Sequence, residues 1–160
     1  MRLPLKDIIK HPEQLSERAM AHVLIEHLTK LGYVAVTELV LDSSMFDINK
    51  LTGKNITKVR IDVAAYKDSK ITFIEVENGL WSTHPVMYRE FAQRVFLAYP
   101  DEYTSPTDHE QIEMAKMYGI GIVSVSLNRS VCSVLPPVDY DIPKAISNAV
   151  ISLINKRKGK

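Results

Sequence analysis

Two neighbouring stretches of the chain carry carboxylates among apolar residues. Asp62 lies in the first stretch, and Glu75 and Glu77 lie at the end of the second. Asp68-Ser69 between them is typical of a tight turn, so the two stretches are predicted to form a β-hairpin. With a two-residue turn, Asp62 faces Glu75 with Cβ atoms about 5 Å apart. Carboxylates that close need a proton, a basic neighbour or a metal ion, and a cluster of oxygen ligands suits Mg²⁺ or Mn²⁺.

A simpler interpretation is that these acids are solvated residues at strand ends, where carboxylates usually lie. Two observations favour a site instead. The acids lie within apolar runs, and one face of the second strand changes from apolar to acidic in the order Ile71, Phe73, Glu75, Glu77. Such a face is typical of a sheet whose end opens into a cleft. The same register places Arg60 opposite Glu77, whereas a three-residue turn would put Asp62 and Glu75 on opposite faces.

The remaining elements must hold this hairpin in place. Apolar residues at helical spacing predict a helix from Ser16 to Leu31, ended by Gly32, and β-branched residues predict a strand over Tyr33–Leu41. The elements predicted after it are strands Val59–Tyr66 and Lys70–Glu77, helix Met87–Gln93, strand Arg94–Tyr99, helix Asp108–Tyr118 with Met114, Ala115 and Met117 facing inward, strands Ile120–Ser126 and Val131–Leu135, and helix Ile142–Lys156. This alternation predicts an α/β fold, a mixed sheet flanked by helices.

The composition is that of one ordinary globular domain over residues 1–160, with 46% hydrophobic and 24% charged residues. The formal net charge of +1 gives no global field that would attract nucleic acid, so local charge matters more. The segment before the hairpin is basic, with Lys58 and Arg60 nearest the acids, and a second basic run extends from Lys156 to Lys160. Both runs are also typical of solvated loops and helix ends.

The cysteine content and the hydropathy bear on the compartment. The single cysteine, Cys132, lies in an apolar strand-like run and is expected to be a small buried residue. One cysteine permits no disulfide within the chain, which agrees with a reducing cytoplasm. The first seven residues lack the apolar core of a signal peptide, and no apolar run is long enough to span a bilayer. We therefore expect a cytoplasmic protein without a membrane partner.

With these elements in place, the sequence resembles the PD-(D/E)xK nuclease superfamily over about residues 16–135. The core of that superfamily is a restriction-endonuclease-like αβββαβ arrangement of one helix, three antiparallel strands, a helix and a further strand. Asp62 matches the acid on the second core strand, and Glu75 matches the acid of the motif on the third strand. The segments Tyr88–Pro100 and Ala115–Gly121 are similar to MmcB-like DNA-repair proteins of the same fold.

The first helix adds a third acid to this resemblance. Ser16-Glu17-Arg18 resembles the first helix of archaeal Holliday junction resolvases, which indicates Glu17 as the acid, with Glu13 and Glu26 as alternatives.

One position departs from the family pattern. Glu77 stands where the family usually has a lysine that positions or activates the attacking water. A Glu-x-Glu version exists in the BamHI-type restriction enzymes, so Glu77 is either the general base or a sign of lost activity, with Glu77 paired to Arg60. In some members the next helix supplies the basic residue, and the chain offers Arg89 or Arg94 there, beside Gln93.

The resemblance implies phosphodiester hydrolysis with Mg²⁺ or Mn²⁺, in which Glu77 deprotonates or orients the water. The ligands that it implies for the metal are Asp62, Glu75, Glu17 and the backbone carbonyl of Val76. The contacts expected for DNA are Lys58, Arg60 and Arg89 on phosphates, and Trp81, which either stacks on an unpaired base or packs within the protein.

Two functions remain open from the sequence. The first is a metal-dependent DNA endonuclease that acts in repair, recombination or restriction. The second is a catalytically inactive nuclease-fold module that binds DNA or a protein partner. Homodimerisation is also left open.

Overall fold

The computed structural model describes residues 15–42, 58–77, 84–100 and 108–160. Within these ranges the helices are α2 (Glu17–Lys30), α4 (His84–Tyr88), α5 (Asp108–Tyr118) and α6 (Lys144–Lys158). The strands are β1 (Val34–Asp42), β2 (Lys58–Lys67), β3 (Lys70–Val76), β4 (Arg94–Pro100), β5 (Gly121–Val125) and β6 (Val131–Leu135). The helices and strands follow one another in the order that the sequence predicts.

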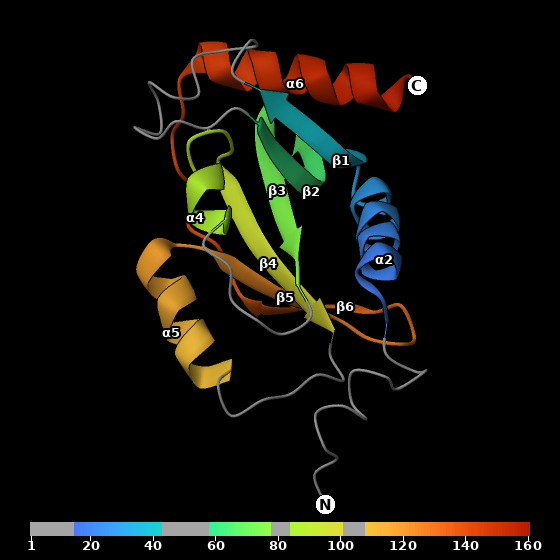
Figure 1. The fold of residues 1–160 in the computed structure, drawn as a ribbon, viewed down its shortest axis with the longest axis vertical. Coiled ribbons are helices and arrows are strands. Elements are labelled where there is room, and N and C mark those ends of the chain that lie inside the picture. The colour runs from blue at the N-terminus through green and yellow to red at the C-terminus, as the bar shows by residue number, and fades with distance from the viewer. Residues whose placement is uncertain (1–14, 43–57, 78–83, 101–107) are drawn as a thin grey trace, which may run out of the picture.

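The strands form a single mixed sheet of six, in the order β1-β2-β3-β4-β5-β6 (Figure 1). β1, β2 and β3 run antiparallel to one another, β3, β4 and β5 run parallel, and β6 is antiparallel to β5. Parallel neighbours require a crossover connection, and α4 and α5 lie in the two connections that join β3, β4 and β5. The prediction of an α/β fold with a mixed sheet flanked by helices is confirmed.

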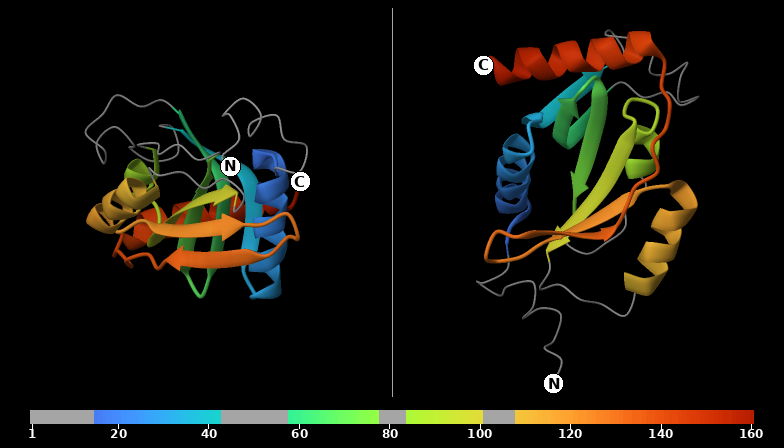
Figure 2. Two further views of the ribbon diagram at one scale, coloured as in Figure 1. Left: turned by 90° about the horizontal axis from the view of Figure 1, so that it is seen from below. Right: turned by 180° about the vertical axis from the view of Figure 1, so that it is seen from behind.

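Each face of the sheet has its own hydrophobic core, and Figures 1 and 2 place α2 and α5 on opposite sides of the sheet. The core under α2 contains Met20, Val23, Leu24, Val63, Ala65, Ile74 and Val76. The core of the other face takes residues from α4, α5 and α6 and contains Ile61, Phe73, Tyr88, Leu97, Ala115, Val150 and Ile154. Both faces of β2 and β3 are therefore covered, which explains their nearly continuous apolar sequence.

The hairpin of β2 and β3 has the predicted register. Lys67 pairs with Lys70, and the pairing continues to Val63 and Ile74. The two turn residues between the strands, Asp68 and Ser69, have φ values of 51° and 65°. Positive φ at both central residues matches the right-handed twist of the strands that the turn joins.

Helix α2 begins and ends where the sequence indicates. The Oγ of Ser16 accepts a hydrogen bond from the Ala19 N–H at 3.0 Å, which caps the first turn. Gly32 follows the helix with a φ of 93°, a conformation that favours glycine. This cap fixes Glu17 in the first turn of α2, near the end of the sheet where β2 begins and β3 ends.

Three local predictions are wrong. Helix α4 spans His84–Tyr88 and not the predicted Met87–Gln93. Gln93 lies just before β4, and its Oε1 accepts the Ile71 N–H of β3 at 2.7 Å. In α5 only Ala115 of the three predicted inward residues is buried, and Met114 and Met117 are 37% and 76% exposed.

The third wrong prediction concerns Cys132, which is exposed and not buried. It lies on β6, an edge strand of the sheet. None of the helices in the described part of the chain is long and apolar enough to cross a lipid bilayer.

Candidate functional site

The site begins where β2 and β3 stop pairing. Their paired register runs as far as Val63 and Ile74, and beyond it the Oδ2 of Asp62 accepts the Val76 N–H at 2.9 Å. The Asp62 side chain thus accepts a hydrogen bond from a backbone N–H of β3 that has no backbone acceptor on β2. The predicted direct pairing of Asp62 with Glu75 is not among the paired residues of the hairpin, although both line the same cavity and the charge of Asp62 acts on Glu75.

Glu75 is a buried carboxylate, 8% exposed, on the face of β3 opposite α2. The Tyr88 hydroxyl donates to its Oε2 at 2.6 Å. Burial raises the pKa of Glu75 to about 8, the Tyr88 hydrogen bond opposes this change, and the charges of Asp62 and Glu77 add to it. Glu75 is therefore mostly protonated at neutral pH in the metal-free protein.

Tyr88 can satisfy either protonation state of Glu75. Its hydroxyl also lies 3.1 Å from the backbone oxygen of Arg60, which can only accept a hydrogen bond. When Glu75 is charged, Tyr88 donates to it. When Glu75 is protonated, Glu75 can donate to Tyr88, and Tyr88 can donate to Arg60. Burial and the bond to Glu75 raise the pKa of Tyr88, so the hydroxyl keeps its proton.

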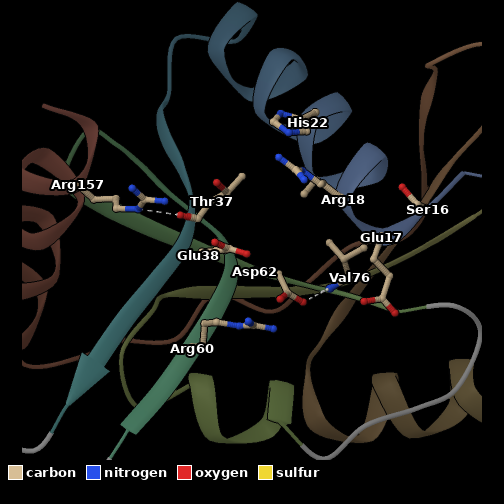
Figure 3. A pocket seen from close by; sticks show the side chains of 11 residues that line it. Ser16, Glu17, Arg18, His22, Thr37, Glu38, Arg60, Asp62, Val76 and Arg157 are labelled. Carbon is tan, nitrogen blue, oxygen red and sulfur yellow. Dashed lines mark hydrogen bonds between the residues drawn. The ribbon is translucent and has the colours of Figure 1, made fainter. Parts of the chain in front are cut away.

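Glu17 joins these acids from helix α2. Burial raises the pKa of Glu17 first, the charge of Asp62 raises it further, and the Arg60 guanidinium opposes both. Figure 3 shows the Glu17 carboxylate next to Val76, on the same side of the sheet as the Asp62 carboxylate. Three separate elements, α2, β2 and β3, thus bring Glu17, Asp62 and Glu75 to one end of the sheet.

Two cavities meet at Asp62. The larger has a volume of about 760 Å³ and lies between α2, β1, β2 and the end of α6. Its lining residues include Glu17, Arg18, His22, Glu38, Arg60, Asp62 and Arg157. The smaller cavity, of about 220 Å³, lies on the other face and includes Lys58, Arg60, Asp62, Glu75 and Tyr88. Asp62 and Arg60 border both, so a group bound in either cavity lies near the acids.

Four residues with ionisable side chains line the larger cavity and are not among the predicted site residues. They are Arg18, His22, Glu38 and Arg157. The spacing of Arg18 and His22, four residues apart on α2, puts them on one helix face and is a signal that the sequence contains. Arg157 belongs to the basic run Lys156–Lys160, but nothing in the local sequence places that run at the cavity. It reaches the cavity because α6 packs against β1, and its Nε donates to the backbone oxygen of Thr37 at 3.2 Å.

Glu38 marks a break in β1. Its φ of 53° is in the left-handed region, which costs a residue with a side chain about 1–2 kcal/mol. Val36 precedes the break and Leu39 and Leu41 follow it in the same core, so the side-chain alternation of β1 shifts by one residue there. The shift lies directly opposite Asp62, because the neighbouring pairs are Thr37–Val63 and Leu39–Ile61.

The other predicted residues occupy different places. Lys58 lines the smaller cavity and Val76 the larger one. The Glu77 N–H donates to the Ala98 oxygen at 2.8 Å, and the Glu77 charge acts on Glu75. Trp81, with Glu13, lies outside the described residues. Arg89 stacks on the Tyr140 ring, with its guanidinium carbon 3.8 Å from the ring centre.

Neither Arg94 nor Gln93 lies at the acids, so neither supplies the basic residue that the resemblance leads us to expect there. β3 and β4 are parallel, so Arg94 pairs with Thr72 at the start of β3, whereas the acids are at its end. The Arg94 guanidinium binds both carboxylate oxygens of Asp139, at 2.6 and 3.0 Å. This ion pair fastens the segment before α6 to the sheet.

The donor chemistry of the acids suits a hard divalent cation. The charge of Asp62 raises the pKa of Glu75, so the two carboxyl groups oppose each other when both are charged, and a cation can replace the proton that relieves this repulsion. Within residues 15–42, 58–77, 84–100 and 108–160, however, no group of three or more His, Cys, Asp or Glu side chains is arranged to hold a metal ion.

Comparisons with known proteins do not assign the chain to a family. No family model matches it, and no curated protein is significantly similar to it. Among solved structures it is similar to AF1548, described as a protein of unknown function, with a TM-score of 0.47 and 14% sequence identity. The match covers 68% of this chain and 58% of that one, so the chain spans less than two thirds of AF1548.

Proposed function

We propose that the protein is a metal-dependent DNA endonuclease of the PD-(D/E)xK superfamily that uses Mg²⁺ or Mn²⁺. The observation that carries the proposal is the position of Asp62 where β2 and β3 separate, because it lines one cavity with Glu17 of α2 and the other cavity with Glu75 of β3. The order α2-β1-β2-β3-α4-β4 also agrees with the αβββαβ core that the sequence resembles. The single cysteine supports a cytoplasmic location.

The residues divide the chemistry of phosphodiester hydrolysis between them. Asp62 and Glu75 hold the metal, with Glu17 and the Val76 carbonyl as further ligands, and the metal supplies charge neutralisation and a lowered pKa of water. Glu77 orients or deprotonates the attacking water. Arg60, which borders both cavities, and Lys58 bind phosphates of the DNA backbone.

A cleavage assay at low salt tests the proposal. Duplex, single-stranded, flap and junction DNA are incubated with Mg²⁺ or Mn²⁺ and the wild type, Asp62→Asn or Glu75→Gln. We expect cleavage of at least one substrate and a loss of at least about 100-fold in both variants, because each removes one metal-binding charge. Glu26→Gln, an exposed acid of α2 that pairs with Arg129, is the control and should cleave like the wild type. Cleavage that survives both site variants would contradict the proposal.

The alternative is a nuclease-fold module that binds DNA or a protein without cutting. It is supported by Glu77 in the lysine position and by the Tyr88 hydrogen bond to Glu75. A thermal shift with Mn²⁺ separates the two functions, since a ligand that binds the folded state raises its stability. Stabilisation by Mn²⁺ that disappears in Asp62→Asn supports the nuclease; no stabilisation and no cleavage support the binding module.

A further inference from the structure

The larger cavity has a basic part and an acidic part. Figure 3 shows Arg18 and His22 reaching into it from α2 and Arg157 reaching in from α6 beside Thr37, whereas Glu17 lies on the other side of Asp62, near Val76. These side chains come from elements far apart in the sequence. We call Arg18, His22 and Arg157 the basic end of the cavity.

The guanidinium groups of the basic end are available to a ligand. Among the described residues Arg18 forms no ion pair and no side-chain hydrogen bond, although three carboxylates line the same cavity. Arg157 uses its Nε for the Thr37 oxygen, and its two terminal nitrogens have no hydrogen-bond acceptor among the residues that the structure describes. Guanidinium groups bind phosphate oxygens through paired, charge-assisted hydrogen bonds, so an oxyanion is the ligand that fits them.

The last turn of α6 closes the cavity on the side of β1. The Arg157 Nε donates to the backbone oxygen of Thr37, and the Lys158 Nζ donates to the backbone oxygen of Ala35 at 3.2 Å. A nucleic-acid strand that runs from the acids toward the basic end therefore meets helix α6. The volume of about 760 Å³ is in the range of small-ligand pockets, which suits the end of a strand better than the side of a double helix.

Glu38 opposes an anion at the basic end. It lines the same cavity from the break in β1, and a bound phosphate would meet its carboxylate. This charge lowers the affinity for phosphate, so removing it should strengthen phosphate binding, whereas removing either arginine should weaken it.

We propose that the basic end binds the terminal phosphate of a nucleic-acid strand, so that the protein selects strand ends that carry a phosphate monoester. The inference rests on the proposed function, because it places the adjoining nucleotides at the acids. A terminal monoester carries more negative charge than an internal diester, and two guanidinium groups neutralise it better than one. The experiment decides whether the terminal phosphate is at a 5′ end or at a 3′ end.

Binding is measured in EDTA, without metal, by fluorescence anisotropy of single-stranded oligonucleotides. Three forms are compared: 5′-phosphate, 3′-phosphate and no terminal phosphate, each labelled at the opposite end. We expect one phosphorylated form to bind about tenfold more tightly than the unphosphorylated strand, and Arg18→Gln and Arg157→Gln each to abolish this preference. Glu38→Gln should increase it. Arg129→Gln, which removes an equal charge from the β5–β6 turn, is the matched control and should keep it.

Equal affinity for all three forms overturns the proposal, and so does a preference that survives in both arginine variants. Affinity that depends on Arg18 without any preference for a phosphorylated end indicates internal phosphates and also overturns it. Asp62→Asn separates this inference from the proposed function, because it should stop cleavage and keep the preference. A preference without cleavage in the wild type contradicts only the nuclease, and cleavage without a preference contradicts only the terminal-phosphate site.

Discussion

At the scale of single residues, the central feature is the raised pKa of Glu75. The carboxyl group is buried, the charges of Asp62 and Glu77 act on it, and the Tyr88 hydroxyl donates a hydrogen bond to it. A metal that binds here must displace the proton on Glu75, so metal affinity should rise as the pH increases toward 8.

The same proton makes the stability of the metal-free protein depend on pH. The pKa of Glu75 rises from its ordinary value of 4.5 to about 8 on folding, so the folded protein binds the proton more tightly than the unfolded chain. The stabilisation is complete below pH 4.5 and is lost as the pH rises through about 8. Glu75→Gln cannot lose a proton. We expect thermal unfolding in EDTA to show the variant more stable than the wild type above pH 8, by at least about 2 °C, with little difference near pH 4. A difference that does not change with pH would show that Glu75 does not titrate in this range.

Part of this site can be predicted from local sequence, and the rest depends on contacts between distant segments. Asp62 and Glu75 follow from a hairpin, in which local turn chemistry fixes which residues face each other. Glu17 came from the resemblance to a family and not from spacing. Glu38 and Arg157 reach the cavity through the pairing of β1 with β2 and the packing of α6 on β1, and a single sequence does not state such contacts between distant segments.

At the scale of elements, β1 is strained next to the site. Glu38 holds a positive φ in the middle of a strand, directly opposite Asp62. The break keeps β1 paired with β2 on both sides of the site while it turns the Glu38 side chain into the cavity. Strain of this kind is more often kept at functional sites than elsewhere.

This strain can be measured with two variants that both remove the carboxylate. Glu38→Gly relieves the positive φ, whereas Glu38→Ala keeps it. We expect the glycine variant to be more stable than the alanine variant by about 1 kcal/mol in urea unfolding. The test compares the free energies of unfolding of the two variants. An alanine variant as stable as the glycine variant would show that the backbone of β1 is not strained at this position.

The ends of elements were predicted well where local chemistry fixes them. The Ser16 cap, Gly32 and the Asp68-Ser69 turn are local signals, and the structure follows all three. The length of α4 was not predicted, because the Gln93 side chain bonds to the Ile71 N–H of a different element. The exposure of Met117 was not predicted either, since helical spacing shows a periodic face but not whether another element covers it.

At the scale of the whole molecule, one sheet separates two cores that share its strands. Leu24 of α2 is 1% exposed in one core, and Ile154 of α6 is fully buried in the other. β2 and β3 contribute to both cores, so loss of packing on one face weakens the strands that support the other. The prediction of one domain implies that the two cores unfold together.

Core variants on the two faces test this cooperativity. We expect Leu24→Ala and Ile154→Ala each to lower the free energy of unfolding by about 2–5 kcal/mol. Each variant should shift one transition, with the same midpoint by far-ultraviolet circular dichroism and by tyrosine fluorescence. Val138→Ala, at a position that is 50% exposed, should change the stability by less than about 0.5 kcal/mol. Two separate transitions in either core variant would contradict a single domain.

The class of the fold could be predicted from the alternation of elements, but the neighbours of each strand could not. Turn residues predict that β2 pairs with β3 and β5 with β6. Nothing in the local sequence of β4 states that it lies between β3 and β5, because parallel pairing joins strands through crossovers longer than any local signal.

The hydrogen bond from the Val76 N–H to Asp62 has an evolutionary consequence. Position 62 is under two separate demands, since its side chain both faces the acids of the site and completes the backbone of β3. On the proposed function, a descendant without nuclease activity would still need an acceptor at this position to keep the end of β3 in place. Asparagine meets that need and alanine does not, so we expect inactive lineages to change this residue to asparagine before any apolar replacement.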